Sequence, residues 1–104
     1  MHNYGAVRQL ELTVRVAYGS DLDQVLATAR EVLARNPRVL PDLTPVVGVE
    51  ALGEAGVTVT VAPWVAVPDY IPARAELYQE LAQAMRAREI SVGVPQREVR
   101  LVSR

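Results

Sequence analysis

Residues 16–25 run Val16-Ala17-Tyr18-Gly19-Ser20-Asp21-Leu22-Asp23-Gln24-Val25, and within them one pattern of apolar residues replaces another. Upstream, residues 10–16 alternate apolar and polar side chains, which is typical of a strand with one buried face. Downstream, apolar residues recur at three- and four-residue steps and predict an amphipathic helix: Leu22, Val25, Leu26, Ala29, Val32 and Leu33. The segment is therefore predicted to join a strand to a helix.

Ser20 is placed to cap the N-terminus of this helix. Asp23, three residues later, completes a Ser-x-x-Asp variant of the capping box, and its charge suits the helix dipole. Asp21 and Asp23 also have the spacing of a D-x-D metal site, but no other motif supplies further ligands. Capping is therefore the favoured interpretation, and we expect no metal site here.

The composition predicts one globular domain and excludes several classes of protein. The chain has 104 residues, no cysteine and a formal charge of -1, with acidic and basic residues mixed along its length. Disulfides, thiolate metal sites and a basic nucleic-acid surface are therefore not expected. The longest apolar run, residues 57–67, is too short for a membrane span, and the polar start is not a signal peptide. The opening residues have no strand or capping pattern, so we expect a segment of a longer protein.

The middle of the chain predicts an antiparallel hairpin. Asn36-Pro37 should end the first helix, because the residue before a proline avoids the helical conformation. A proline-rich loop over residues 38–45 leads to a strand over residues 46–52 and a second strand over residues 57–62, which Pro63 interrupts. Gly53 and Gly56 lie in the turn between these strands and can take positive φ.

The rest of the chain predicts a second helix and a final strand. Asp69 should cap a helix that begins near Tyr70, with Pro72 tolerated in its first turn. Its predicted apolar stripe is Ile71, Ala75, Tyr78, Leu81, Ala82 and Met85. The last strand, residues 98–104, alternates Val99 and Leu101 with charged side chains. The order β-α-β-β-α-β predicts a ferredoxin-like α+β fold, with two helices on one face of an antiparallel sheet.

A ferredoxin-like sheet has an open face, and this face is the first candidate site. It is predicted to carry Glu11, Thr13, Arg15, Thr58 and Thr60. It lacks the stacking aromatics of an RNA-recognition module, and the loop at residues 17–20 lacks the arginine of an acylphosphatase-type anion cradle.

No enzyme is predicted from the titratable residues, and no cofactor. The one histidine, His2, lies in a terminal segment, so no nucleophile-base pair or metal-histidine cluster can be assembled. Trp64 is the remaining candidate site residue. A lone tryptophan at a strand end suits a core position and a protein interface equally, and both stay open.

Six segments carry a resemblance, in the same order along the chain. They are residues 14–25, Asn3-Tyr4, Asn36-Pro37-Arg38-Val39-Leu40, Glu50-Ala51-Leu52-Gly53, Val59-Thr60-Val61-Ala62-Pro63-Trp64-Val65 and Glu89-Ile90-Ser91-Val92-Gly93-Val94-Pro95-Gln96. Together they resemble the C-terminal cytoplasmic domain of the small-conductance mechanosensitive channel (MscS) family. Two residues depart from that pattern: Glu89 stands where the family commonly has glycine, and Gly93 replaces a proline. The exit from the second helix is therefore expected to differ.

The resemblance implies a bacterial channel of seven subunits in which this domain walls a cytoplasmic vestibule below the cell membrane. It implies roles in oligomer assembly and in filtering ions and small solutes during osmotic downshock. Residues 1–94 would be the ferredoxin-like domain, and residues 95–104 a strand that joins either a barrel between subunits or the sheet of its own domain. The interface residues implied are Trp64, Pro95, Gln96, Val99 and Leu101.

A soluble regulatory module that binds a small molecule on the open sheet face is the alternative function, since many ferredoxin-like domains act in this way. Screening amino acids and nucleotides for a shift in melting temperature would separate the two hypotheses.

Overall fold

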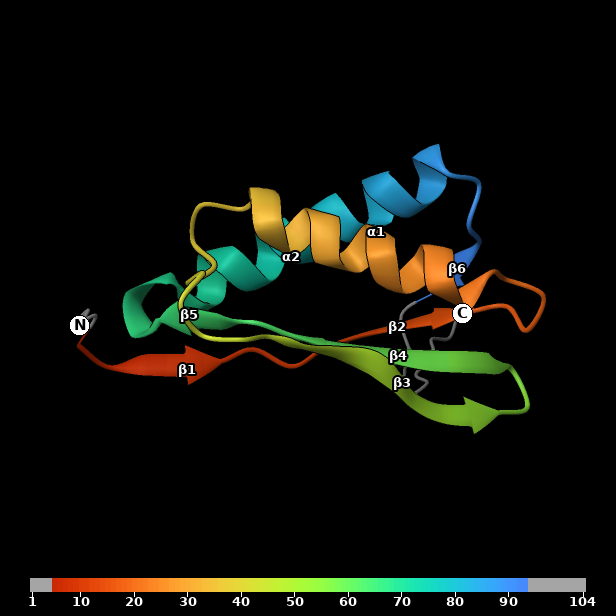
Figure 1. The fold of residues 1–104 in the computed structure, drawn as a ribbon, viewed down its shortest axis with the longest axis horizontal. Coiled ribbons are helices and arrows are strands. Elements are labelled where there is room, and N and C mark those ends of the chain that lie inside the picture. The colour runs from red at the N-terminus through yellow and green to blue at the C-terminus, as the bar shows by residue number, and fades with distance from the viewer. Residues whose placement is uncertain (1–4, 94–104) are drawn as a thin grey trace, which may run out of the picture.

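The computed structural model describes residues 5–93, which form one antiparallel sheet layer covered by two helices. The strands are β1 (Val7–Gln9), β2 (Leu12–Val16), β3 (Val46–Gly53), β4 (Gly56–Ala62), β5 (Trp64–Ala66) and β6 (Val92–Gly93). The helices are α1 (Leu22–Arg35) and α2 (Tyr70–Ala87), and a short 3-10 turn, η1 (Val67–Asp69), precedes α2. Both helices lie on the same side of the strands (Figure 1).

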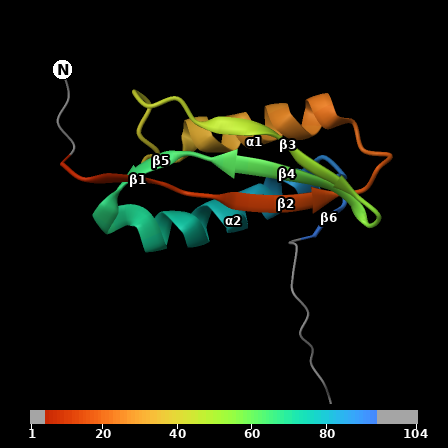
Figure 2. The ribbon, with the colours of Figure 1, turned by 90° about the horizontal axis from the view of Figure 1, so that it is seen from below.

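The main sheet has the strand order β3-β4-β2-β6, and every neighbouring pair in it is antiparallel. This order confirms the predicted ferredoxin-like arrangement, with the first and third strands of the motif, β2 and β4, at its centre. Seen from the strand side, α1 lies behind β3 and α2 lies towards β2 (Figure 2).

Two paired strands are each interrupted at the level of Pro63. It separates β4 from β5, and opposite it Leu10 and Glu11 separate β1 from β2. The Leu10 N–H donates to the Pro63 carbonyl at 2.8 Å, so the two strands stay together where Pro63 cannot donate. Beyond this point β1 and β5 form a two-stranded ribbon, with Gln9 opposite Trp64. The break at Pro63 is confirmed, and the first strand is longer and more divided than its alternation predicts.

Asp21, not Ser20, caps α1. The Asp21 carboxylate accepts a hydrogen bond from the Gln24 N–H at 3.3 Å, three residues into the helix. Ser20 instead closes the preceding turn, where its N–H donates to the Ala17 carbonyl at 3.0 Å. The prediction was one residue early because both residue types cap helices well. The end of the helix at Asn36 is confirmed.

The buried face of α2 differs from the predicted stripe. It consists of Ala73, Leu77, Leu81 and Met85, of which only Leu81 and Met85 were expected. Ile71 is 72% exposed, Tyr78 is half-buried, and Ala75 and Ala82 are exposed. Asp69 does precede the helix, but its side chain forms no capping hydrogen bond. Ala73 in the same first turn is buried, so Ile71 is exposed because it lies on another face of the helix, and hydrophobicity alone placed it on the wrong face.

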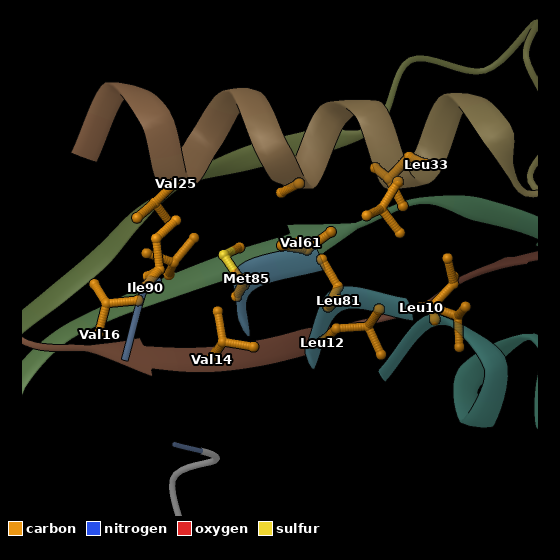
Figure 3. Close-up of a cluster of buried hydrophobic side chains, with 14 of the residues drawn as sticks. Leu10, Leu12, Val14, Val16, Val25, Leu33, Val61, Leu81, Met85 and Ile90 are labelled. Carbon is orange, nitrogen blue, oxygen red and sulfur yellow. The ribbon is translucent and has the colours of Figure 1, made fainter. Parts of the chain in front are cut away.

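The core lies between the sheet and the two helices. Figure 3 shows Leu81 and Met85 of α2 among Leu12, Val14 and Val61 from the sheet, with Val25 and Leu33 entering from α1. Each strand of the central pair contributes every second residue, so the alternation at residues 10–16 is confirmed as a buried face. Burial of this kind contributes about 25 cal/mol per Å² of apolar surface removed from water.

Glu89 adopts a left-handed conformation at the end of α2, with φ of 60°. The Ile90 N–H donates to the Met85 carbonyl at 2.9 Å and the Glu89 N–H to the Arg86 carbonyl at 3.0 Å. These two bonds form a Schellman motif, in which glycine is the usual residue at the left-handed position. Glu89 therefore adopts a left-handed backbone conformation that glycine, the common residue of the family pattern, would adopt with less conformational strain.

Replacing Glu89 by glycine is expected to raise the free energy of unfolding by about 0.5–1 kcal/mol, because glycine has no Cβ to strain this conformation. Urea denaturation of the purified chain measures the change. Glu89→Ala is the matched control: alanine keeps a Cβ, so its stability should stay within about 0.5 kcal/mol of the parent value. An equal gain in both variants would show that the glutamate side chain, rather than the backbone, carries the cost.

The fourth strand of the sheet is β6, which is not the strand predicted from the sequence. Val92 lies opposite Val16, and Gly93 lies opposite Arg15. Gly93 was expected to separate the second helix from the last strand, but it is itself a strand residue. The predicted strand over residues 98–104 lies outside the described residues.

Candidate interaction surfaces

The open face of the sheet carries the polar residues that its alternation predicts. Thr13 lies opposite Thr60 and Arg15 opposite Thr58 in the register of β2 and β4, on the face away from the buried valines. A hollow of about 400 Å³ lies on this face, and Glu11, Thr13, Glu50 and Thr60 are among the residues that line it. The structure therefore brings predicted residues from different strands together in one place.

Glu50 is a member of this face that the sequence did not indicate. The pairing of β3 with β4 shifts by one residue between Val49 and Ala51, so Glu50 occupies a β-bulge. There its carboxylate accepts a hydrogen bond from the Thr60 hydroxyl. The sequence signal was the interrupted alternation at residues 49–52, which a regular strand would not show.

Trp64 lies in β5, half-buried, between two neighbouring segments. It is paired with Gln9 of β1, and its carbonyl accepts a hydrogen bond from the Leu40 N–H at 2.9 Å. Val39 also bridges to Val65, so the loop after α1 is attached to the same strand. A half-buried ring fits both interpretations that the sequence left open. The other predicted interface residues, Pro95, Gln96, Val99 and Leu101, lie outside the described residues.

A polar cluster that sequence reasoning missed joins the end of α1 to α2. Asn36 is 4% exposed, and its amide nitrogen donates to Glu80 at 3.1 Å and to Glu76 at 3.4 Å. Its side-chain oxygen accepts from the Arg38 N–H at 2.8 Å, which makes an Asx turn through Pro37. The signal available in the sequence was Asn36-Pro37-Arg38 itself, since asparagine favours such turns.

Arg38 neutralises the carboxylates of this cluster. Its Nε lies 3.2 Å from Glu76, and its Nη1 lies 2.7 Å from Asp69, the residue before α2. The hydrogen bond and charge of Glu76, followed by those of Asp69, raise the pKa of the Arg38 guanidinium above its ordinary value. These acids are engaged in holding the loop after α1 against α2, which also explains why Asp69 does not cap its own helix.

Three further features are relevant to binding. Within residues 5–93, no group of His, Cys, Asp and Glu side chains has the arrangement of a metal site. No helix in that part of the chain is long and apolar enough to cross a membrane. Arg88 of the α2 C-terminus binds Glu31 of α1 at 2.6 Å, so the two helices are also joined by an ion pair.

Strand β3 carries three exposed apolar side chains. Val46 is 54% exposed, Val49 43% and Leu52 70%. Among the described strands, only β4 pairs with β3, so its other edge has no strand partner within residues 5–93. The β3–β4 turn is attached to the loop between β2 and α1, because the Tyr18 hydroxyl donates to the Gly53 carbonyl.

Comparison with known proteins gives consistent matches. Residues 10–92 match the family model described as "Mechanosensitive ion channel MscS, C-terminal". An uncharacterised MscS family protein of Synechocystis is 30% identical over 95 residues, which cover 91% of this chain and 32% of the relative. A small-conductance mechanosensitive channel of Helicobacter pylori is 26% identical over 91 residues, covering 86% of this chain and 33% of that protein.

Solved structures share the fold. The crystal structure of Helicobacter pylori MscS in its closed state superposes with a TM-score of 0.80 at 22% identity, over 98% of this chain and 41% of that one. The cryo-EM structure of Arabidopsis thaliana MSL1 gives a TM-score of 0.66 at 13% identity, over 86% of this chain and 34% of that one. The chain thus spans about a third of the length of the curated relatives it matches.

Proposed function

The chain belongs to the MscS family of mechanosensitive ion channels, and from this membership we propose that it forms the cytoplasmic vestibule wall of a tension-gated channel. The observation that carries the proposal is the family match, which extends over both helices and the whole four-stranded sheet except its last residue. The likeness to a closed-state channel structure supports the same assignment at the level of the fold. No catalytic role is part of the proposal.

Membrane attachment and tension sensing are assigned to the rest of the parent protein. This chain covers only 32–35% of its curated relatives, so most of a channel of this family lies outside it. The domain itself is placed on the cytoplasmic side of the cell membrane, where ions and small solutes reach the pore past its walls. Its partners are further copies of the same chain, seven in the complete channel.

Assembly is assigned to Trp64 and to the last ten residues of the chain. Trp64, half-buried in the β1–β5 ribbon, is proposed as a contact between subunits. Residues 95–104, with Pro95, Gln96, Val99 and Leu101, are proposed as a separate C-terminal strand that joins those of other subunits. The position of β6 supports this division, since residues 92–93 already occupy the fourth place in the sheet.

Patch recording tests the proposed function directly. The full-length parent is expressed in cells that lack such channels, and suction is applied to excised patches. We expect conductance steps that appear only under tension and are absent from the same cells without the parent gene. A parent that reaches the membrane, as shown by immunoblot, and still gives no tension-activated conductance would refute the proposal.

Truncating the parent after Val94 tests the assembly role of the last residues. We expect a smaller fraction of assembled oligomer than in the intact parent, because the proposed strand contacts between subunits are lost. Cross-linking of detergent-solubilised protein followed by gel electrophoresis measures this fraction. The same amount of oligomer in both proteins would contradict the barrel assignment but leave the channel function standing.

A further inference from the structure

A hollow beside the second half of α1 has no part in the proposed channel role. It has a volume of about 480 Å³, which lies within the range of about 300–1,000 Å³ that small-molecule sites occupy. One wall is α1, where Leu33 and Ala34 lie three and four residues after Arg30 on one face of the helix. The other wall is the loop over residues 37–45, which runs from the end of α1 to the start of β3 (Figure 1).

Contacts with other elements hold the loop wall in place. The Leu40 N–H donates to the Trp64 carbonyl at 2.9 Å, and Val39 forms a bridge with Val65 of β5. The ion pairs of Arg38 attach the same loop to α2. The wall is therefore formed before any molecule binds, as is usual for small-molecule sites.

The loop wall offers few hydrogen-bonding groups to a bound molecule. The prolines at positions 37, 41 and 45 have no N–H, and the N–H groups of Val39 and Leu40 already donate to backbone carbonyls. The Asn36 side chain also borders the hollow, but its nitrogen donates to two glutamates of α2 and its oxygen accepts from a backbone N–H. A molecule in the hollow therefore meets mainly hydrocarbon on this side.

Among the described residues that line the hollow, only Arg30 carries a charge. It is exposed on α1, and within residues 5–93 no Asp or Glu side chain forms an ion pair with it. Leu33, by contrast, is buried and gives the hollow an apolar floor. A guanidinium binds a carboxylate through two parallel N–H donors, so the unpaired charge beside this apolar surface favours an anion.

We propose that the hollow binds a small amphipathic carboxylate, with its apolar chain against Leu33, Val39 and Leu40 and its carboxylate at Arg30. The apolar chain provides most of the affinity, because binding removes its hydrocarbon surface from water. Arg30 determines which charge is preferred, since an exposed ion pair contributes little affinity by itself. The site lies within one chain, so it goes beyond the channel function and is tested without measuring conductance.

NMR titration of the purified chain with octanoate tests the site. We expect the amide signals of Leu33, Val39 and Leu40 to shift in a saturable way, while the signal of Val59 in the central strand stays unchanged. Acetate, which has the carboxylate but no apolar chain, should shift none of them at the same concentrations. Octylamine, which is cationic at pH 7, should bind more weakly than octanoate, because it meets the like charge of Arg30.

Exposed positions on α1 supply the variants. Arg30→Gln should raise the dissociation constant of octanoate about threefold to fivefold, the size of an exposed ion pair, and leave that of the uncharged octan-1-ol unchanged. Ala34→Leu should abolish the binding of both probes, because the added carbons occupy the hollow. Arg35→Gln and Ala27→Leu are the matched controls: both residues are exposed on the same helix, neither lines the hollow, and neither change should alter binding.

Several results would overturn the proposal. Octanoate that shifts none of the amides around the hollow does not bind there. Equal affinities for octanoate and octylamine, or equal weakening of octanoate and octan-1-ol by Arg30→Gln, show that Arg30 does not select an anion. Unchanged binding in Ala34→Leu places the probe elsewhere. Shifts around the hollow that grow with protein concentration, without any probe, show that a second copy of the chain occupies it instead.

Discussion

Gly56→Ala is expected to lower the free energy of unfolding by about 3 kcal/mol, because the new Cβ has no room and the backbone conformation resists it. A Cβ built at Gly56 would lie 2.4 Å from the Val16 carbonyl oxygen of β2, and φ at this residue is 147°. The obstructing atom belongs to the backbone of a central strand, so it cannot rotate away. Relief requires β2 and β4 to separate at the end of their ladder.

Urea denaturation of the purified chain measures this loss, and Gly48→Ala is the matched control. Gly48 lies in β3 of the same sheet, has no positive φ, and has nothing within 4 Å of the position of a Cβ. We expect its stability to stay within about 0.5 kcal/mol of the parent value. Equal losses at the two glycines would mean that the approach of Gly56 to Val16 does not limit stability.

Leu77→Ala is expected to cost about 3 kcal/mol, the usual consequence of leaving a cavity in a close-packed core. Leu77 is 0% exposed and lies on the buried face of α2 with Ala73, Leu81 and Met85. The surrounding helices and strands are held in place by the rest of the core, so they cannot move in to fill the space that the leucine side chain leaves.

Ile71→Ala is the control in the same helix, because Ile71 is 72% exposed and truncating it uncovers little new apolar surface. Its cost should be below about 0.5 kcal/mol. Thermal unfolding followed by circular dichroism gives both values. If Ile71→Ala proved the more costly of the two, the face of α2 predicted from the sequence would be right and the face in the structure wrong.

The sheet could be predicted from sequence because its two central strands alternate without interruption. Val57, Val59 and Val61 face the core as their spacing indicates, and Pro63 breaks the strand where a missing donor requires it. The turn was predicted less well. Of its two glycines only Gly56 has positive φ, because only there does the backbone pass against β2.

These errors share one physical cause: a local sequence pattern does not show which distant parts of the chain contact a given residue. Ile71 was preferred to Leu77 for the core, although it is the face of α2 with Ala73 and Leu77 that packs into the core. Aspartate is a residue type that often caps helices, but the side chain of Asp69 is bound by Arg38 from another part of the chain. The candidate site followed the same rule: the threonines were found by alternation, and Glu50 was missed because a bulge places it.

The pairing of β4 with both β3 and β2 has a consequence for the order of folding. The β3–β4 hairpin joins neighbouring residues, from Gly53 and Gly56 outward, so only a short loop must close to begin it. The other side of β4 must wait for β2, since Val57 pairs with Val16 and Val61 with Leu12, far back in the chain. The rate of refolding should therefore be limited by this long-range contact: β3 and β4 pair early, and β2 pairs with β4 later.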